Sequence, residues 1–252
     1  MTSQLKTKTQ AGFTLVELAI VLMIIGLLIG GILRGQELME NARVTTTIQQ
    51  TKAYDGATTT FRDSYGSIPG DIVNPGTRLP NCGANGGCNV AGDGNGLIGT
   101  AAQVVTTRAG NDNSALTNEH RRFWTHLATA RLISGINPTS TNGTATWSDQ
   151  FPTAKIAGGF HVTQMNVPAA GAVPAISGMF LVLRNAAAAG AIQEGNGVSA
   201  VSPSRAAQID RKLDDGLPDT GDVIGVGATG CQGTYTETLE SRNCNLLIHL
   251  QN

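Results

Sequence analysis

The stretch QAGFTLVELAIVLMIIGLLIGG, residues 10–31, is an apolar run interrupted by a single carboxylate, Glu17. From Phe13 to Leu33 no other side chain is ionisable. As a helix, these residues would rise about 31 Å, which is close to the thickness of the hydrocarbon core of a bilayer. The run therefore predicts a helix that spans a membrane.

The residues on either side of this run predict its orientation. Lys6 and Lys8 precede it, so the positive-inside rule keeps that end in the cytoplasm and sends the rest of the chain out. Arg34, Glu37 and Glu40 follow the run and mark its outer interface. We expect a single-pass membrane protein whose N-terminus is cytoplasmic.

A cleaved secretory signal peptide does not fit the sequence. Such peptides are cut after the apolar region at a site made of small residues. Here Leu33 is followed by RGQELMENARV (34–44), which contains no such site. A retained signal anchor explains the length of the run but not Glu17, because a carboxylate in mid-membrane costs about 2.5–3.5 kcal/mol on insertion scales.

The hexapeptide GFTLVE, from Gly12 to Glu17, resembles the processing signature of type IV pilins and of the pseudopilins of type II secretion. The short basic leader that ends at Gly12 is similar to theirs as well. In that family, a membrane aspartyl peptidase cuts after the glycine, and the new N-terminal residue is methylated. The resemblance implies that residues 1–12 are removed as a leader and that Phe13 becomes the N-methylated terminus.

The resemblance also gives Glu17 a role in assembly. After cleavage, Phe13 would carry a cationic amine in a low-dielectric setting, one helical turn from Glu17. The carboxylate would offset the amine of an incoming neighbour in a filament, and an acidic group also suits the N-terminus of a helix. The implied partners are prepilin peptidase, other pilin or pseudopilin subunits, the assembly platform of the bacterial inner membrane and the lipid bilayer. The head would then lie in the periplasm and later in a pilus or pseudopilus.

The membrane run departs from many pilins because it lacks a proline about two-thirds along its length. Gly26, Gly30 and Gly31 are its only weak points as a helix, each costing about 1 kcal/mol relative to alanine. We expect a helix that is continuous or only softened at the glycines.

The chain after the run predicts an α+β fold. Apolar residues recur at near-helical spacing up to Gly66; they are Leu38, Ala42, Ile48, Tyr54, Ala57, Phe61 and Tyr65. We expect one long N-terminal helix with a transmembrane half (13–33) and an amphipathic half (34–66). This helix would pack on a small β-rich globular head (67–252), and the resemblance to pilins implies the same layout.

Local patterns place two helices and four strands in the head. The helices are predicted at Asn118–Ser134, with Thr117 or Asn118 as its cap and Gly135 after it, and between Ser202 and Gly216. The strands are predicted at Ile156–Val167, Ser177–Arg184, Val223–Gly227 and Asn245–Gln251.

Four cysteines form two close pairs, Cys82 with Cys88 and Cys231 with Cys244. An even number of cysteines at local spacing favours disulfides in an exported domain, and local pairing is favoured among the three possible connectivities. Zinc is the alternative, but neither pair has C-x-x-C spacing or a histidine beside it.

Glycine-rich and acidic segments raise two further possibilities. The segments Gly92–Gly99 and Gly225–Gly230 contain G-x-G-x-x-G, but a dinucleotide site needs a strand before this motif and a helix after it, so we predict turns. Asp93 and Asn95-Gly96 also match part of a calcium loop, and a cluster of carboxylates lies around KLDDGLPDTGD (212–222); its members are Asp210, Asp214, Asp215, Asp219 and Asp222. These runs lack the full EF-hand register, and Asp and Asn are also common turn formers. We predict no cofactor and keep calcium as a hypothesis.

Nothing in the sequence predicts catalysis. The histidines form no metal pattern, and the chain has no nucleophile elbow, H-E-x-x-H motif or P-loop. A net charge of −1 gives no electrostatic case for nucleic acid. We therefore predict a structural subunit of a type IV pilus-like or type II pseudopilus filament, and not an enzyme. The alternative is a minor tip subunit or adhesin whose head binds a substrate, a surface or DNA.

Overall fold

The computed structural model describes residues 12–83, 87–99, 104–108, 111–112, 118–139, 146–170, 174–187, 190–191 and 198–250. The predicted leader up to Ala11, the possible cap Thr117 and the predicted strand end at Gln251 lie outside these residues. The chain divides into two compact units between Ala42 and Arg43.

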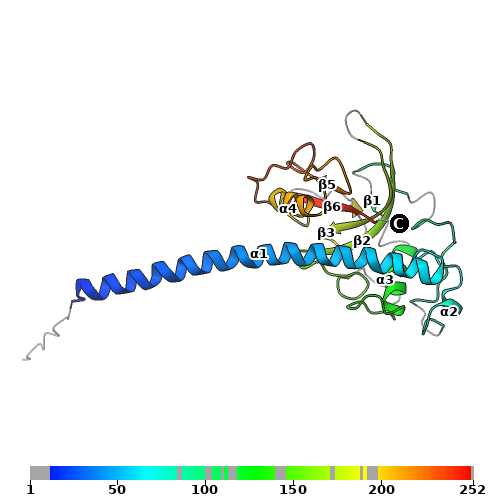
Figure 1. The fold of residues 1–252 in the computed structure, drawn as a ribbon, viewed down its shortest axis with the longest axis horizontal. Coiled ribbons are helices and arrows are strands. Elements are labelled where there is room, and N and C mark those ends of the chain that lie inside the picture. Colours follow the sequence, from blue (N-terminus) through cyan, green and yellow to red (C-terminus); the bar gives the residue numbers. More distant parts are fainter. Residues whose placement is uncertain are drawn as a thin grey trace, which may run out of the picture. The chain divides into compact units, whose positions relative to one another are not determined.

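Helix α1, Leu15–Tyr65, is the longest element (Figure 1). It continues without a break through Gly26 and Gly30, as expected for a run without proline. It ends where predicted, because Gly66 takes the left-handed conformation that usually follows the last turn of a helix (φ 61°).

The part of α1 in the first unit differs from the part in the second. Every described residue from Gly12 to Ala42 is exposed or half-buried. From Val44 onward, one face of the helix is buried in the core of the second unit; its residues are Val44, Thr47, Ile48, Thr51, Tyr54, Ala57, Thr58 and Phe61. The second half of α1 is therefore amphipathic, as its sequence pattern indicates.

The second unit contains a four-stranded antiparallel sheet with the strand order β2-β3-β6-β5. Its strands are β2 (Gly159–Val167), β3 (Ile176–Arg184), β6 (Cys244–His249) and β5 (Val223–Gly227). The prediction for β5 agrees with the structure, and β3 begins one residue earlier than predicted. β2 begins three residues later than predicted, because the amide of Ala154 donates to Gly158 O (3.0 Å) and closes a turn over the preceding residues.

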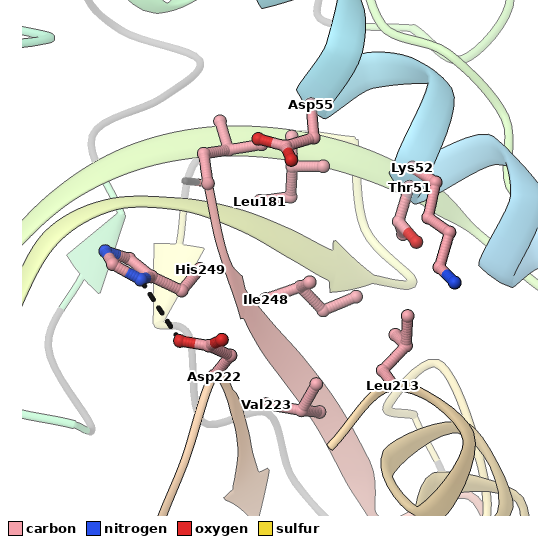
Figure 2. A pocket seen from close by; sticks show the side chains of 10 residues that line it. Thr51, Lys52, Asp55, Leu181, Leu213, Asp222, Val223, Ile248 and His249 are labelled. Carbon is pink, nitrogen blue, oxygen red and sulfur yellow. Dashed lines mark hydrogen bonds and ion pairs between the residues drawn. The ribbon is translucent and has the colours of Figure 1, made fainter. Parts of the chain in front are cut away.

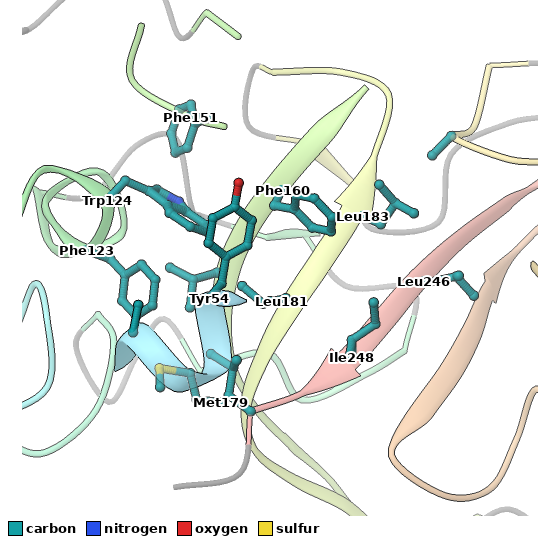
Figure 3. Packing of buried hydrophobic residues seen from close by; sticks show 14 of the residues in the cluster. Tyr54, Phe123, Trp124, Phe151, Phe160, Met179, Leu181, Leu183, Leu246 and Ile248 are labelled. Atoms are coloured by element: carbon teal, nitrogen blue, oxygen red, sulfur yellow. The ribbon is translucent and has the colours of Figure 1, made fainter. Parts of the chain in front are cut away.

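Both faces of this sheet are buried. On one face, Phe160, Leu181 and Ile248 belong to the main core with α1 and α3 (Figure 3). Tyr54 of α1 contacts the ring of Trp124 edge-on, with centroids 5.1 Å apart, in the same core. The opposite face carries a second apolar cluster, composed of Val105, Met165, Ile176, Phe180, Val182, Ile224, Val226 and Leu247. Strand β3 (ISGMFLVLR) accordingly reads as a nearly continuous apolar run, whereas β2 (GFHVTQMNV) keeps polar residues between its apolar ones.

Two further helices flank the sheet. α3 spans Asn118–Thr129 and stops five residues before its predicted end, because Arg131 takes a left-handed conformation (φ 60°). α4 spans Pro203–Leu213, with Ser202 at its N-cap position, although the Ser202 side chain makes no capping hydrogen bond. A short helix, α2 (Pro75–Arg78), and a two-stranded pair, β1 (Asn111–Asp112) with β4 (Gly190–Ala191), complete the described elements.

Candidate functional site

The first turn of α1 is closed by Thr14 and Glu17. Glu17 Oε2 accepts hydrogen bonds from the Thr14 amide (2.8 Å) and the Thr14 hydroxyl (2.9 Å). In return, the Glu17 amide donates to Thr14 Oγ1 (3.3 Å). This reciprocal pairing is a capping box, in which two otherwise unpaired amides at the start of a helix are satisfied by side chains. Sequence reasoning assigned Glu17 to a neighbour's amine and noted that an acidic group suits the N-terminus of a helix, but it missed Thr14, although the T-x-x-E spacing was visible.

Apolar residues surround this cap. Phe13 precedes the N-cap residue and Leu18 lies in the first turn and a half, which are the two positions of a hydrophobic staple. Together with Glu17, Ile20 and Val21 they line a hollow of about 480 Å³. Glu17 therefore lies at the edge of an apolar surface, and Gly12 and Phe13, the predicted cleavage site, come directly before the cap.

The apolar surface continues along the whole membrane run. Large apolar side chains from Phe13 to Leu33 are all at least 45% exposed, and Leu15 reaches 87%. A β-carbon added at Gly26, Gly30 or Gly31 would meet no atom within 4 Å. Among the described helices, only α1 is long and apolar enough to cross a membrane. Exposed apolar surfaces of this extent are typical of segments that contact a membrane or another protein.

Two disulfides brace the second unit. Cys82 pairs with Cys88, with Cα atoms 5.4 Å apart, and Cys231 pairs with Cys244, with Cα atoms 5.5 Å apart. This is the local pairing that the spacing favoured, and the zinc alternative is wrong because the thiols are bonded to each other. All four side chains are buried. The second bridge fixes the first residue of β6 to the loop that follows β5.

The glycine-rich segment Gly92–Gly99 is a turn, as predicted, and two buried carboxylates hold it. Asp71 accepts hydrogen bonds from the amides of Gly94 (2.7 Å) and Gly96 (2.8 Å) and, at 3.2 Å, from that of Asn95. Glu119 of α3 accepts from the amides of Asp93 (3.0 Å) and Gly99 (2.6 Å). Burial raises the pKa of both Asp71 and Glu119, and the amide donors partly offset this rise.

Asp71, Asp93 and Glu119 could together face a cation, since their carboxylate oxygens lie within 4.8 Å of one another. Sequence reasoning included Asp93 but missed Asp71 and Glu119, because only the folding of the chain brings them together. The amides of the turn already occupy oxygens of both buried carboxylates. Their arrangement therefore favours a structural role in shaping the turn.

The acidic segment between residues 210 and 222 is also organised by its own hydrogen bonds. Buried Asp210 accepts from the Tyr235 hydroxyl (2.9 Å) and the Gly216 amide (3.0 Å). Burial raises the pKa of Asp210 to about 6, although the two hydrogen bonds act in the opposite direction and lower it. Asp215 accepts from the Leu217 amide (2.8 Å).

The other aspartates of this segment are bonded as well. Asp214 accepts from the Asp222 amide, and Asp219 forms an ion pair with Arg108 at 2.5 Å. Asp210, Asp214 and Asp215 form the second acidic group that could face a cation among the described residues. These contacts are those of turn formers and caps, and calcium stays a hypothesis.

A pocket of about 300 Å³ lies between α1 and the sheet (Figure 2). Its floor is apolar, and Figure 2 shows His249 directed toward Asp222, whose carboxylate lies 3.3 Å from Nδ1. The one hydroxyl in its lining, on Thr51, donates to Ile48 O within the helix (2.8 Å). The ionisable residues of the lining are Lys52, Asp55, Asp222 and His249, and its hydroxyl is bonded to the backbone of its own helix.

His126 has a structural role in the core. It is fully buried in α3, where its Nδ1 accepts a hydrogen bond from the Gly70 amide (2.9 Å) and its Nε2 donates to Cys88 O (3.1 Å). Burial lowers the pKa of His126 to about 4, and the nearby charge of Arg122 acts in the same direction. The neutral ring therefore joins α3 to the turn that follows α1 and to the first disulfide loop.

Comparison with known proteins agrees with the geometry of the N-terminal segment. The prokaryotic N-terminal methylation motif matches residues 7–33, which include the cap and the exposed apolar run. No curated protein and no solved structure matches the chain. The motif belongs to structural subunits that are processed as prepilins, not to a class of enzymes. The N-terminal segment of this chain therefore carries the signature of the type IV pilin and pseudopilin family.

Proposed function

We propose that the chain is a structural subunit of a type IV pilus-like or type II pseudopilus filament. In this proposal, prepilin peptidase cleaves between Gly12 and Phe13, Phe13 is N-methylated, and the subunit polymerises through α1. The observation that carries the proposal is the exposed apolar surface from Phe13 to Leu33, which lies within the methylation motif. Such a surface needs lipid or neighbouring helices around it.

The proposed mechanism is the exchange of one apolar environment for another. Before assembly, the run spans the inner membrane with its N-terminus in the cytoplasm and the head in the periplasm. During assembly, helices of neighbouring subunits replace the lipid around α1, so little apolar surface is exposed to water on the way. The carboxylate of Glu17 then offsets the amine of a neighbour's Phe13 and sets the register between subunits.

Cleavage and assembly are tested together in cells that contain prepilin peptidase and an assembly platform. We expect the wild-type chain in filaments sheared from the cells. Gly12→Val should keep its leader and stay in the membrane; no atom lies within 4 Å of the position of a β-carbon at Gly12, so the fold tolerates the change. Gly56→Ala lies outside the apolar run and is equally free of contacts; it is the matched control and should assemble. Wild-type chain that never enters filaments would contradict the proposal.

The tip-subunit alternative is favoured by two features of the sequence. The head spans residues 67–252, and the membrane run has no proline. Quantifying the chain against the total protein of sheared filaments separates the two roles. Abundance along the shaft indicates a major subunit, whereas trace amounts indicate a tip subunit or adhesin.

A further inference from the structure

A second pocket in the head, of about 590 Å³, is positively charged. It lies between α1, the segment after α3 and the segment before β2, and Tyr54, Leu132 and Pro152 form part of its lining. Arg131 and Lys155 also line it, and none of its lining residues is acidic. Within the described part of the chain, neither of these exposed cations has an ion-pair partner. The pocket is therefore suited to an anionic group from outside.

The wall that carries Lys155 is fixed to α1. The Gln50 side chain donates from Nε2 to Thr153 O (3.0 Å) and accepts at Oε1 from the Lys155 amide (3.1 Å). The amide of Ile156 donates to Thr47 Oγ1 (3.1 Å). These three bonds hold the backbone of the wall, so that Lys155 projects from a fixed position.

Arg131 stands where glycine would fit the backbone better. It follows α3 in the left-handed conformation (φ 60°), which most side chains disfavour and which helix ends usually give to glycine. Its amide donates to Ala128 O (3.0 Å), and the Leu132 amide donates to Leu127 O (3.0 Å), so the strained turn is held on both sides. A non-glycine residue in this conformation costs free energy, and such outliers are a reason to look for a use of the side chain.

We propose that this pocket binds an acidic surface on the head of a second copy of the chain, a contact that rests on the proposed filament function. Exposed ion pairs are weak and would not hold a free ligand. In a filament, α1 would bring heads together at a high effective concentration, where weak ion pairs are enough to select one arrangement. Asp63 on α1 is exposed and has no partner within the described residues, so it is a suitable acidic group on the second head.

The test reverses both charges in the full-length chain. We expect the double variant Arg131→Glu with Lys155→Glu to reduce the amount of chain in sheared filaments about tenfold. The matched control reverses an exposed arginine and an exposed lysine outside the pocket, Arg242→Glu with Lys212→Glu, and should assemble like the wild type. Equal yields from the two double variants would overturn the inference. Absence of filaments from the wild type itself would instead contradict the proposed function.

A third variant separates folding from assembly. Arg131→Gly removes both the strain and the charge, so the thermal midpoint of the detergent-solubilised chain should rise by about 2–4 °C while filament yield falls. Arg131→Lys keeps the charge and should assemble normally. A chain with Arg131→Gly that assembles as well as the wild type would overturn the inference, because a structural role alone predicts that result.

Discussion

Glu17 caps α1 with one of its two carboxylate oxygens: Oε2 accepts hydrogen bonds from both the amide and the hydroxyl of Thr14. Oε1 accepts no hydrogen bond within the described residues. One carboxylate can therefore close its own helix and still present an oxygen to a second group. This arrangement reconciles the capping role seen in the structure with the proposed pairing to a neighbour's amine.

Substitutions can distinguish the two roles of Glu17, which are to cap α1 and to pair with a neighbour's amine. Glu17→Gln keeps an oxygen that can accept from Thr14 but removes the charge, and we expect filament yield to fall at least about tenfold, because the neighbour's buried amine is left unpaired. Thr14→Ala removes the capping hydroxyl, which should cost about 1 kcal/mol of helix stability and lower the yield less. Quantifying the chain in sheared filaments checks both. A normal yield from Glu17→Gln would refute the pairing role.

Asp71 should be more important for stability than its exposed neighbour Asp93. Asp71→Asn leaves one carbonyl oxygen where a carboxylate accepted from the amides of Gly94, Asn95 and Gly96, so we expect a loss of about 2 kcal/mol in the free energy of unfolding. Asp93→Asn is the matched control and should stay within about 0.5 kcal/mol of the wild type. Denaturant titration of both variants measures the difference, and equal losses would contradict the assignment.

Calcium should have little effect on the head. The carboxylates of Asp71 and Asp210 already accept hydrogen bonds from amides or a hydroxyl. We expect the thermal midpoint to change by less than about 2 °C between excess calcium and excess chelator, because a ligand that does not bind the folded state cannot stabilise it. A large rise with calcium would show a metal site at one of the two acidic groups.

His126 should make stability depend on pH. Its pKa is lowered from an ordinary 6.5 to about 4, so below pH 6.5 the unfolded chain takes up a proton that the folded chain resists. The contribution of His126 to the free energy of unfolding is therefore complete above pH 6.5. It is lost as the pH falls toward 4, and the total loss is about 3 kcal/mol. Asp210 acts in the opposite sense, because its raised pKa favours the folded state as the pH falls through 6.

Comparison with a variant isolates this effect, since Asp210 is common to both proteins. His126→Gln should be about 2 kcal/mol less stable than the wild type at pH 7.5, and the difference should shrink as the pH approaches 4. Denaturant titrations across this range provide the test. A difference that stays constant with pH would show that the ring of His126 is not held neutral.

The sequence predicted the features that depend on local pattern. The apolar run and the helical spacing of the apolar residues after it predicted α1 as one long helix. Gly66 predicted its end, because glycine readily takes the left-handed conformation found there. The strand β5 was predicted correctly, because Val223–Gly227 is a short apolar run between turns. The disulfide pairs follow from cysteines that lie close together in the sequence.

Features that depend on the folded chain were missed or misplaced. Gly135 suggested the end of α3, but the helix ends earlier because Arg131 accepts a left-handed conformation that no propensity assigns to arginine. Asp71 and Glu119 are far apart in the sequence, so nothing local shows that both hold the same turn. Thr14 was different, since its T-x-x-E spacing with Glu17 was readable and its capping role was overlooked.

The most direct measurement is the N-terminal mass of the chain recovered from sheared filaments. The account predicts a polypeptide that begins at Phe13 and carries one methyl group on its terminal amine. A chain that still contains Met1–Gly12, recovered from cells with an active prepilin peptidase, would contradict it.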